Sequence, residues 1–139
     1  MAKRIANPIA VRRYGVAGEP GREVVLTIGK PRPDPKRPER WACTVLLEGL
    51  PDERRRRGRG VDAVQALQDA MMYARHELDR CAIPLTWLEG EADDFGLPHA
   101  VPSYPGSGIR QKVEHYIDQQ LKKSIRKAKE RQAAKRSGA

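Results

Sequence analysis

The chain has 139 residues, with 27 Lys and Arg residues against 18 Asp and Glu residues and a formal net charge of +9. This length accommodates one domain, or one domain with tails. Leu, Ile, Val and Phe make up 27 residues, just under a fifth of the chain, so not every segment can belong to a packed core. No apolar run approaches the roughly 20 residues that a membrane-spanning helix needs.

The first ten residues, MAKRIANPIA, carry positive charge but no long apolar stretch, so we expect no secretory signal and a cytoplasmic location. The two cysteines, Cys43 and Cys81, are then expected to be thiols in a reducing compartment. They form no Cys-x-x-Cys pair, and the sequence has no His-x-x-x-His pattern, so we expect no metal site.

Charge is segregated along the chain. The net charge is +8 over residues 1–60, −6 over residues 61–108 and +7 over residues 109–139. Two interpretations stay open: the basic segments attract an external polyanion, or they fold back on the acidic middle. Exposed ion pairs contribute only about 0–1 kcal/mol each, which does not decide between them.

Three segments in the first half have the two-residue period of strands, namely 8–16, 22–30 and 41–49. The glycines at the ends of residues 18–21 predict a turn between the first two strands. Four prolines in residues 31–40 predict an extended loop without a regular ladder. We expect it to be a stiff hairpin connection rather than a ligand for aromatic-lined grooves.

The segment 51–60, PDERRRRGRG, is predicted to be an exposed loop, because a buried unpaired charge is very costly; a short strand into Val61 at its end stays open. A helix over 62–80 follows, with Asp62 as its cap and Gln65 three residues later. Its apolar residues recur at helical spacing: Val64, Leu67, Met71, Ala74 and Leu78. A short strand over 84–89 is predicted next.

A second helix is predicted over 108–128, with Ser107 as its cap. Its apolar row comprises Ile109, Val113, Tyr116, Ile117, Leu121, Ile125 and Ala128. Beyond Ala128 there is no apolar anchor, so we expect a frayed tail. We expect this helix to cover the sheet, to project, or to pair with a second copy in a homodimer.

These elements predict an α+β fold: a small antiparallel sheet of three or four strands, packed on the helix 62–80, plus a basic C-terminal helix. The compact domain is expected to span 1–98, and 99–139 to form a linker and a basic amphipathic helix. The expected core comprises Val24, Leu26, Ile28, Val45, Leu47, Val64, Leu67, Met71, Leu78 and Trp87.

No pattern of a known enzyme class is present: there is no Gly-x-Ser-x-Gly, no phosphate-binding glycine-rich loop and no His-Glu-x-x-His. His76 and His115 each have an acidic neighbour in sequence, but such neighbours do not face each other on a helix. The acidic run 89–94 lacks the alternate spacing of a calcium loop. We therefore expect neither catalysis nor a cofactor.

The basic segments are the candidate contacts to a partner, because several guanidinium groups together make a phosphate-binding surface. The candidates are Arg54, Arg55, Arg56, Arg57 and Arg59, together with Lys122, Lys123, Arg126 and Lys127. No aromatic residue lies within the arginine run, so base stacking there is not expected. An acidic protein partner and a nucleic-acid backbone both fit these residues.

Seven short motifs stand in a fixed order: IAVRR at 9–13, IGKPRPD at 28–34, WAC at 41–43, EGL at 48–50, GVDAVQAL at 60–67, LTW at 85–87 and GLP at 96–98. With them, residues 9–98 resemble a small bacterial domain family of unknown function. The resemblance implies a compact α+β domain and supplies no catalytic residues. The extension 107–139 lies outside it.

The order of strands, glycine-containing turn and helix is also similar to the partial double-stranded-RNA-binding-like fold of bacterial antitoxins that block a small toxin. The helix entry differs in sequence, so the likeness is one of fold. It favours a non-enzymatic interaction module that binds a protein partner in the manner of an immunity protein or antitoxin. The alternative is a nucleic-acid-binding accessory protein that contacts phosphates. Membrane binding is disfavoured, because the apolar row of the second helix has no Trp or Phe.

Overall fold

The computed structural model describes residues 4–88, 90, 94–99, 106 and 108–138. The chain divides into two compact units, Met1–His99 and Ala100–Ala139. Within the described residues, neither helix combines the length and the apolar character needed to cross a membrane.

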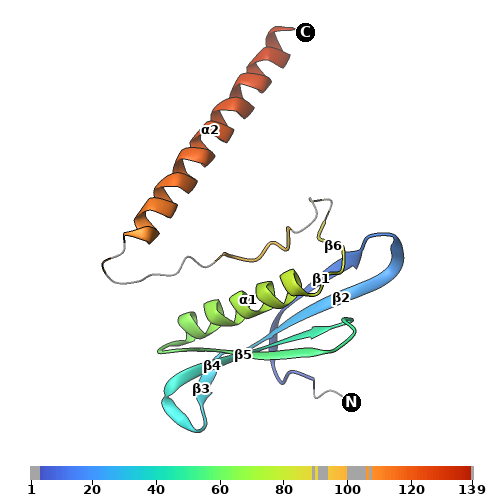
Figure 1. Cartoon of the computed structure of the whole chain (residues 1–139), viewed down its shortest axis with the longest axis vertical. Coiled ribbons are helices and arrows are strands. Elements are labelled where there is room, and N and C mark those ends of the chain that lie inside the picture. The colour runs from blue at the N-terminus through green and yellow to red at the C-terminus, as the bar shows by residue number, and fades with distance from the viewer. Residues whose placement is uncertain (1–3, 89, 91–93, 100–105, 107, 139) are drawn as a thin grey trace. The chain divides into compact units, whose positions relative to one another are not determined.

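The first unit is built on a six-stranded antiparallel sheet (Figure 1). Its four long strands form a meander in which each pairs with the next: β1 (Pro8–Val16), β2 (Glu19–Gly29), β4 (Arg37–Glu48) and β5 (Arg54–Gly60). Two short strands complete it. β3 (Arg32–Asp34) pairs with the start of β4, and β6 (Leu85–Thr86) pairs with the end of β1.

The sheet therefore has more strands than the three or four predicted. The prediction of a loop over 31–40 was wrong, because β3 and the start of β4 flank a turn at residues 35–36. β3 is an edge strand, which needs hydrogen-bond donors on one side only and so tolerates Pro33. The predicted turn at 18–21 is shorter than expected, since β2 already begins at Glu19.

The prediction of a loop over 51–60 was also wrong, although Arg54, Arg55, Arg57 and Arg59 are exposed as expected. β5 pairs residue by residue with β4, from Arg54 opposite Leu47 to Gly60 opposite Trp41. The predicted strand at 84–89 is present, but it is limited to the two residues of β6.

Helix α1 (Ala63–Arg80) covers one face of the sheet (Figure 1). It begins where predicted, because the Asp62 carboxylate accepts a hydrogen bond from the Gln65 backbone N–H at 2.8 Å. The side turned to the sheet is made of small residues, among them Ala66 and Ala70, which are fully buried. Small side chains let the helix backbone approach β5 closely.

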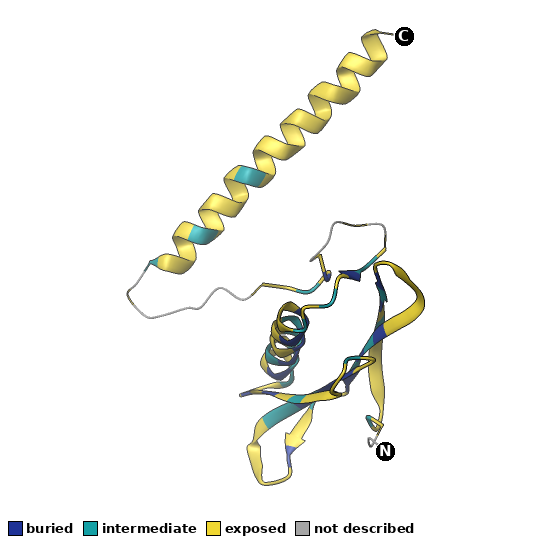
Figure 2. Cartoon of the chain, turned by 45° about the vertical axis from the view of Figure 1, so that its right-hand side comes forward, coloured by how far each residue is buried: buried dark blue, intermediate teal, exposed yellow. Residues whose placement is uncertain are grey.

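The core lies between α1 and the sheet (Figure 2). Six predicted core residues are buried: Val24, Leu26, Ile28, Val45, Leu47 and Leu78. Leu67, Met71 and Trp87 are partly buried. The prediction for Val64 was wrong, since it is 64% exposed. The alanine row of α1 faces the sheet, which places Val64 on the flank of the helix.

The sequence prediction missed the part of the core next to β1. Tyr14 and Phe95 pack edge to face with ring centroids 6.0 Å apart, and the Tyr14 hydroxyl donates to the Phe95 carbonyl at 2.9 Å. Burial raises the pKa of the Tyr14 hydroxyl, although the charge of Arg12 opposes this. Arg12 donates to the same carbonyl at 3.2 Å, and Arg75 donates to the Leu97 carbonyl at 3.1 Å. These contacts fasten the segment after β6 to the domain.

The second unit contains helix α2 (Ile109–Ser137), and none of its described residues is buried (Figure 2). The prediction that the helix ends near residue 128 in a frayed tail was wrong. The residues after Ala128 are largely Ala, Lys, Arg, Gln and Glu. These residue types favour the helix by their intrinsic propensity, so the helix continues without an apolar anchor. The predicted cap Ser107 lies outside the described residues, and Gly108, with φ of 62°, occupies the N-cap position.

Candidate anion-binding site on the open face of the sheet

The arginines of β5 alternate between the two faces of the sheet, because successive side chains of a strand point to opposite sides. Arg54 and Arg56 lie on the side of α1, where both contact it. Arg55, Arg57 and Arg59 lie on the opposite side, which we call the open face. The five predicted arginines therefore do not form one surface.

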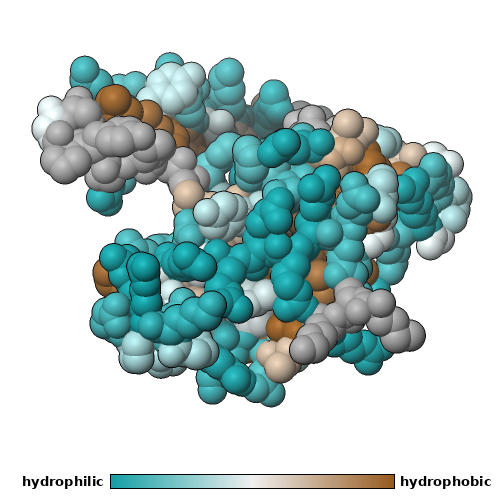
Figure 3. All heavy atoms as spheres, turned by 60° about the horizontal axis from the view of Figure 1, so that its bottom comes forward, coloured by the Kyte–Doolittle hydropathy of each residue, from teal (hydrophilic) through white to brown (hydrophobic). Residues whose placement is uncertain are grey.

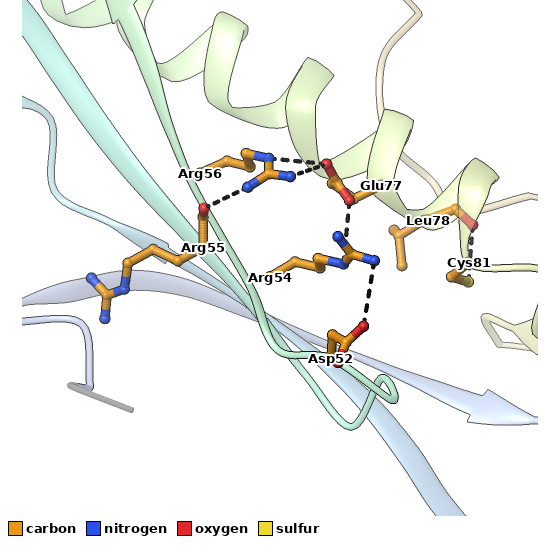
Figure 4. Close-up of polar contacts among 7 residues, drawn as sticks. All are labelled: Asp52, Arg54, Arg55, Arg56, Glu77, Leu78 and Cys81. Carbon is orange, nitrogen blue, oxygen red and sulfur yellow. Dashed lines mark hydrogen bonds and ion pairs between the residues drawn. The ribbon is translucent and has the colours of Figure 1, made fainter. Parts of the chain in front are cut away.

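Arg54 and Arg56 hold a buried carboxylate (Figure 4). The Glu77 side chain on α1 is only 7% exposed, and its Oε1 lies 2.9 Å from both Nε and Nη2 of Arg56. The Oε2 atom of Glu77 lies 3.7 Å from Nε of Arg54. The Nη2 atom of Arg54 lies 4.0 Å from the Asp52 carboxylate. These two arginines join β5 to α1 and have a structural role.

On the open face, a groove of about 300 Å³ lies between β5, β3 and the segment before β1. We call it the basic groove. It is lined by Arg4, Ile5, Ala6, Gly29, Lys30, Arg32, Pro33, Pro35, Ala42, Thr44, Arg55 and Arg57. Five of these twelve side chains are cationic and none is acidic. Figure 3 turns the lower side of Figure 1 toward the viewer, and most of the surface seen there is hydrophilic.

The sheet register brings these cations together. Across β4, Ala42 has Arg32 of β3 on one side and Arg59 of β5 on the other, and Thr44 lies opposite Arg57. Arg32 and Lys30 were not predicted as site residues, because they lie far from the arginine run in sequence. The pairing of β3 and β5 with the same strand brings Arg32 near the arginines of β5, and Lys30 lies between β2 and β3.

One carboxylate lies close to these cations. Asp34, at the end of β3, is buried, and its Oδ1 accepts a hydrogen bond from the Lys36 N–H at 2.9 Å. This hydrogen bond is the main cause that lowers the pKa of the Asp34 carboxyl; burial opposes it, and the charges of Arg57 and Arg59 assist it. Asp34 is therefore ionised at neutral pH and offsets part of the positive charge.

We expect Asp34→Asn to destabilise the domain at pH 7, because the ionised carboxylate interacts more favourably in the folded state than in the unfolded chain. A carboxyl with a lowered folded pKa stabilises above its unfolded pKa, about 3.9, and this contribution disappears as the pH falls through the folded pKa. Urea unfolding of both proteins, from pH 7 down to about pH 2, measures the difference in stability. It should shrink with acidity; a difference that does not change with pH would contradict this assignment.

The other predicted contact residues belong to the second unit. Lys122, Lys123, Arg126 and Lys127 are all exposed on α2. The guanidinium Nε of Arg126 lies 3.8 Å from the Glu130 carboxylate one turn later. Their role as contacts stays a prediction.

The residues considered for chemistry in the sequence do not gather at one place. His76, His99 and His115 are not buried, and His115 contacts Gln119 on its own helix. Over the parts of the chain that the structure describes, no group of three or more His, Cys, Asp or Glu residues lies close enough to hold a metal ion. Residues 89 and 91–93 of the acidic run lie outside the described residues.

An antiparallel sheet with one face covered by a helix and the other open defines this unit as a small α+β domain. A family model described as a domain of unknown function, DUF6968, matches residues 10–99, and the chain belongs to this family. This match confirms the prediction that residues 9–98 belong to a domain family of unknown function. No curated protein and no solved structure matches the chain.

Proposed function

We propose that the protein is a non-enzymatic interaction module that binds a protein partner through α2, in the manner of an immunity protein or antitoxin. The observation that carries the proposal is the exposed apolar row of this helix. Its large exposed members are Ile109, Tyr116, Ile117, Leu121 and Ile125, at 45–61% exposure. Burying an Ile or Leu side chain contributes about 1.5–3 kcal/mol, so such a row is a strong driving force for association.

The charge of α2 indicates what kind of partner fits. The basic residues Lys122, Lys123, Arg126 and Lys127 stand among the apolar residues Leu121 and Ile125. A second copy in parallel orientation would place like charges side by side, which is destabilising. An acidic protein surface with an apolar centre complements this helix.

Strand addition to β5 is disfavoured as a way of binding a partner. β5 lies at the edge of the sheet, but the Arg59 N–H donates to the Asp69 carboxylate at 2.8 Å, and the Arg55 carbonyl accepts from the Arg56 guanidinium at 3.2 Å. Side chains thus already bond to backbone N–H and carbonyl groups of β5 that an incoming strand would need for its own hydrogen bonds. We therefore propose that the protein partner binds to α2 rather than to the edge of β5.

We expect the triple variant Ile117→Ser, Leu121→Ser, Ile125→Ser to abolish stoichiometric recovery of a partner by the immobilised full chain. The matched control, Gln111→Ser, His115→Ser, Gln119→Ser, changes three polar residues outside the apolar row and should recover the partner like the wild type. Quantified pull-downs from native lysate, with the partner identified by mass spectrometry, measure both.

Light scattering on the purified chain completes this test. A mass twice that of one chain, reduced to one chain by the triple variant but not by the control, would assign the row to a homodimer and contradict the proposal. Equal recovery of a partner by the triple variant and by the control would also contradict it.

The alternative, a nucleic-acid accessory protein, is favoured by one observation. Arg55, Arg57 and Arg59 form a row on the open face of β5, where they can meet successive phosphates. No aromatic side chain lines the basic groove, so such contacts would be to the backbone rather than to bases. Titration of the full chain with an oligonucleotide, compared with pyrophosphate, tests this alternative.

A further inference from the structure

The cations of the basic groove converge from three separate elements. Arg4 comes from the segment before β1, Lys30 and Arg32 from the end of β2 into β3, and Arg55 and Arg57 from β5. Like charges around one hollow repel each other, and a bound anion relieves this repulsion. Cations that line one groove from three elements can contact one small anion simultaneously, which a single row on a flat surface cannot do.

Three of the residues that line the groove are small, namely Gly29, Ala42 and Thr44. The segment before β1 forms one wall, since a Cβ atom on Gly29 would lie 2.8 Å from the Ile5 side chain. This wall is held in place by a backbone hydrogen bond of 3.0 Å from the Lys30 N–H to the Asn7 carbonyl. The backbone of this wall is thus tied to the end of β2, and the long side chains of the five cationic residues complete the lining.

We propose that the basic groove is a binding site for a phosphorylated small molecule, which it holds by one or two phosphate groups. Guanidinium groups bind phosphate oxygens in a bidentate manner, and the lysine ammonium and the Thr44 hydroxyl are further donors. This site is independent of the α2 contact proposed above and takes a different class of ligand.

The size and lining of the groove determine which phosphate source fits. A volume of about 300 Å³ is at the lower end of the range for small-molecule sites and holds a diphosphate or a small phosphate ester. A nucleic-acid backbone would place only one or two of its phosphates in the hollow. Several cations in one place favour a ligand with more than one negative charge, such as a diphosphate.

The test is isothermal titration calorimetry of the full chain with pyrophosphate, at constant ionic strength. Arg57→Gln and Arg32→Gln should each weaken binding about tenfold or more, because each removes a charged hydrogen-bonding group from the ligand. Arg13→Gln is the matched control. It removes the same charge from an arginine that pairs with Glu23 outside the groove, and it should change the affinity less than about twofold.

A second variant separates the cavity from general charge attraction. Ala42→Leu fills the groove without changing the charge and should abolish pyrophosphate binding, with folding verified by the thermal unfolding midpoint. Arg57 is exposed, so we expect the Arg57→Gln variant to fold. It therefore still tests the proposal if the Ala42→Leu variant does not fold.

The outcomes separate the two phosphate sources. No pyrophosphate binding, or equal weakening by Arg13→Gln and Arg57→Gln, would overturn the proposal, as would unchanged binding in folded Ala42→Leu. An oligonucleotide without terminal phosphates that binds as tightly as pyrophosphate would show that the ligand is a phosphodiester backbone. That result would overturn the small-molecule site and support the nucleic-acid alternative.

Discussion

Gly58→Ala is expected to destabilise the domain by about 3 kcal/mol, a large effect for adding a single methyl group. A Cβ atom at position 58 would lie 2.2 Å from the backbone nitrogen of Ala70 and 2.5 Å from the carbonyl oxygen of Ala66. Both are main-chain atoms of α1, so no rotamer change relieves the contact. The helix must move away from β5, which weakens the packing of its whole alanine row. Urea unfolding monitored by circular dichroism measures the loss.

Gly15→Ala is the matched control for this prediction. Gly15 also lies in a strand without positive φ, but its added Cβ would meet only the Thr86 hydroxyl oxygen, at 3.0 Å. That hydroxyl belongs to a side chain, which can rotate, so we expect a change within about 1 kcal/mol. If the two variants lose the same stability, the close approach of α1 to β5 is not what requires glycine at position 58.

The double variant Arg54→Ala, Arg56→Ala is expected to destabilise the domain by about 2–3 kcal/mol. It leaves the Glu77 carboxylate, which is 7% exposed, without its cations. Removing the partners of a fully buried charge costs about 3–5 kcal/mol, and the two arginines are 41–44% exposed, so solvent screening reduces this figure. Chemical unfolding at pH 7 measures the change.

The control is the double variant Arg57→Ala, Arg59→Ala. It removes two arginines from the same strand, and it changes the net charge equally, but on the open face. We expect a loss within about 1 kcal/mol, because Arg57 and Arg59 are exposed and substitutions of exposed surface residues seldom cost more. Equal losses in the two double variants would show that the alternation of β5 does not divide its arginines into structural and surface groups.

The same alternation explains why the candidate site was only partly predictable. A run of adjacent arginines has no apolar period, so the sequence reads as a solvated loop. The strand forms because β4 offers a complete row of backbone partners, and because Gly58 and Gly60 leave room for α1. Arg55 and Arg57 were predicted as contact residues and do line the basic groove; Arg54 and Arg56 instead hold Glu77.

The sequence by itself determined those features that depend on neighbouring residues. The Asp62 cap set the start of α1, and the alternation of Val24, Leu26 and Ile28 set the buried face of β2, because helix caps and strand faces depend on local hydrogen bonds and local spacing. Only the tertiary structure decided the rest. Strand pairing between distant segments decides which arginines share a face and how Arg32 comes to lie near Arg57. Such pairing follows from the fit of whole surfaces, which no local pattern encodes.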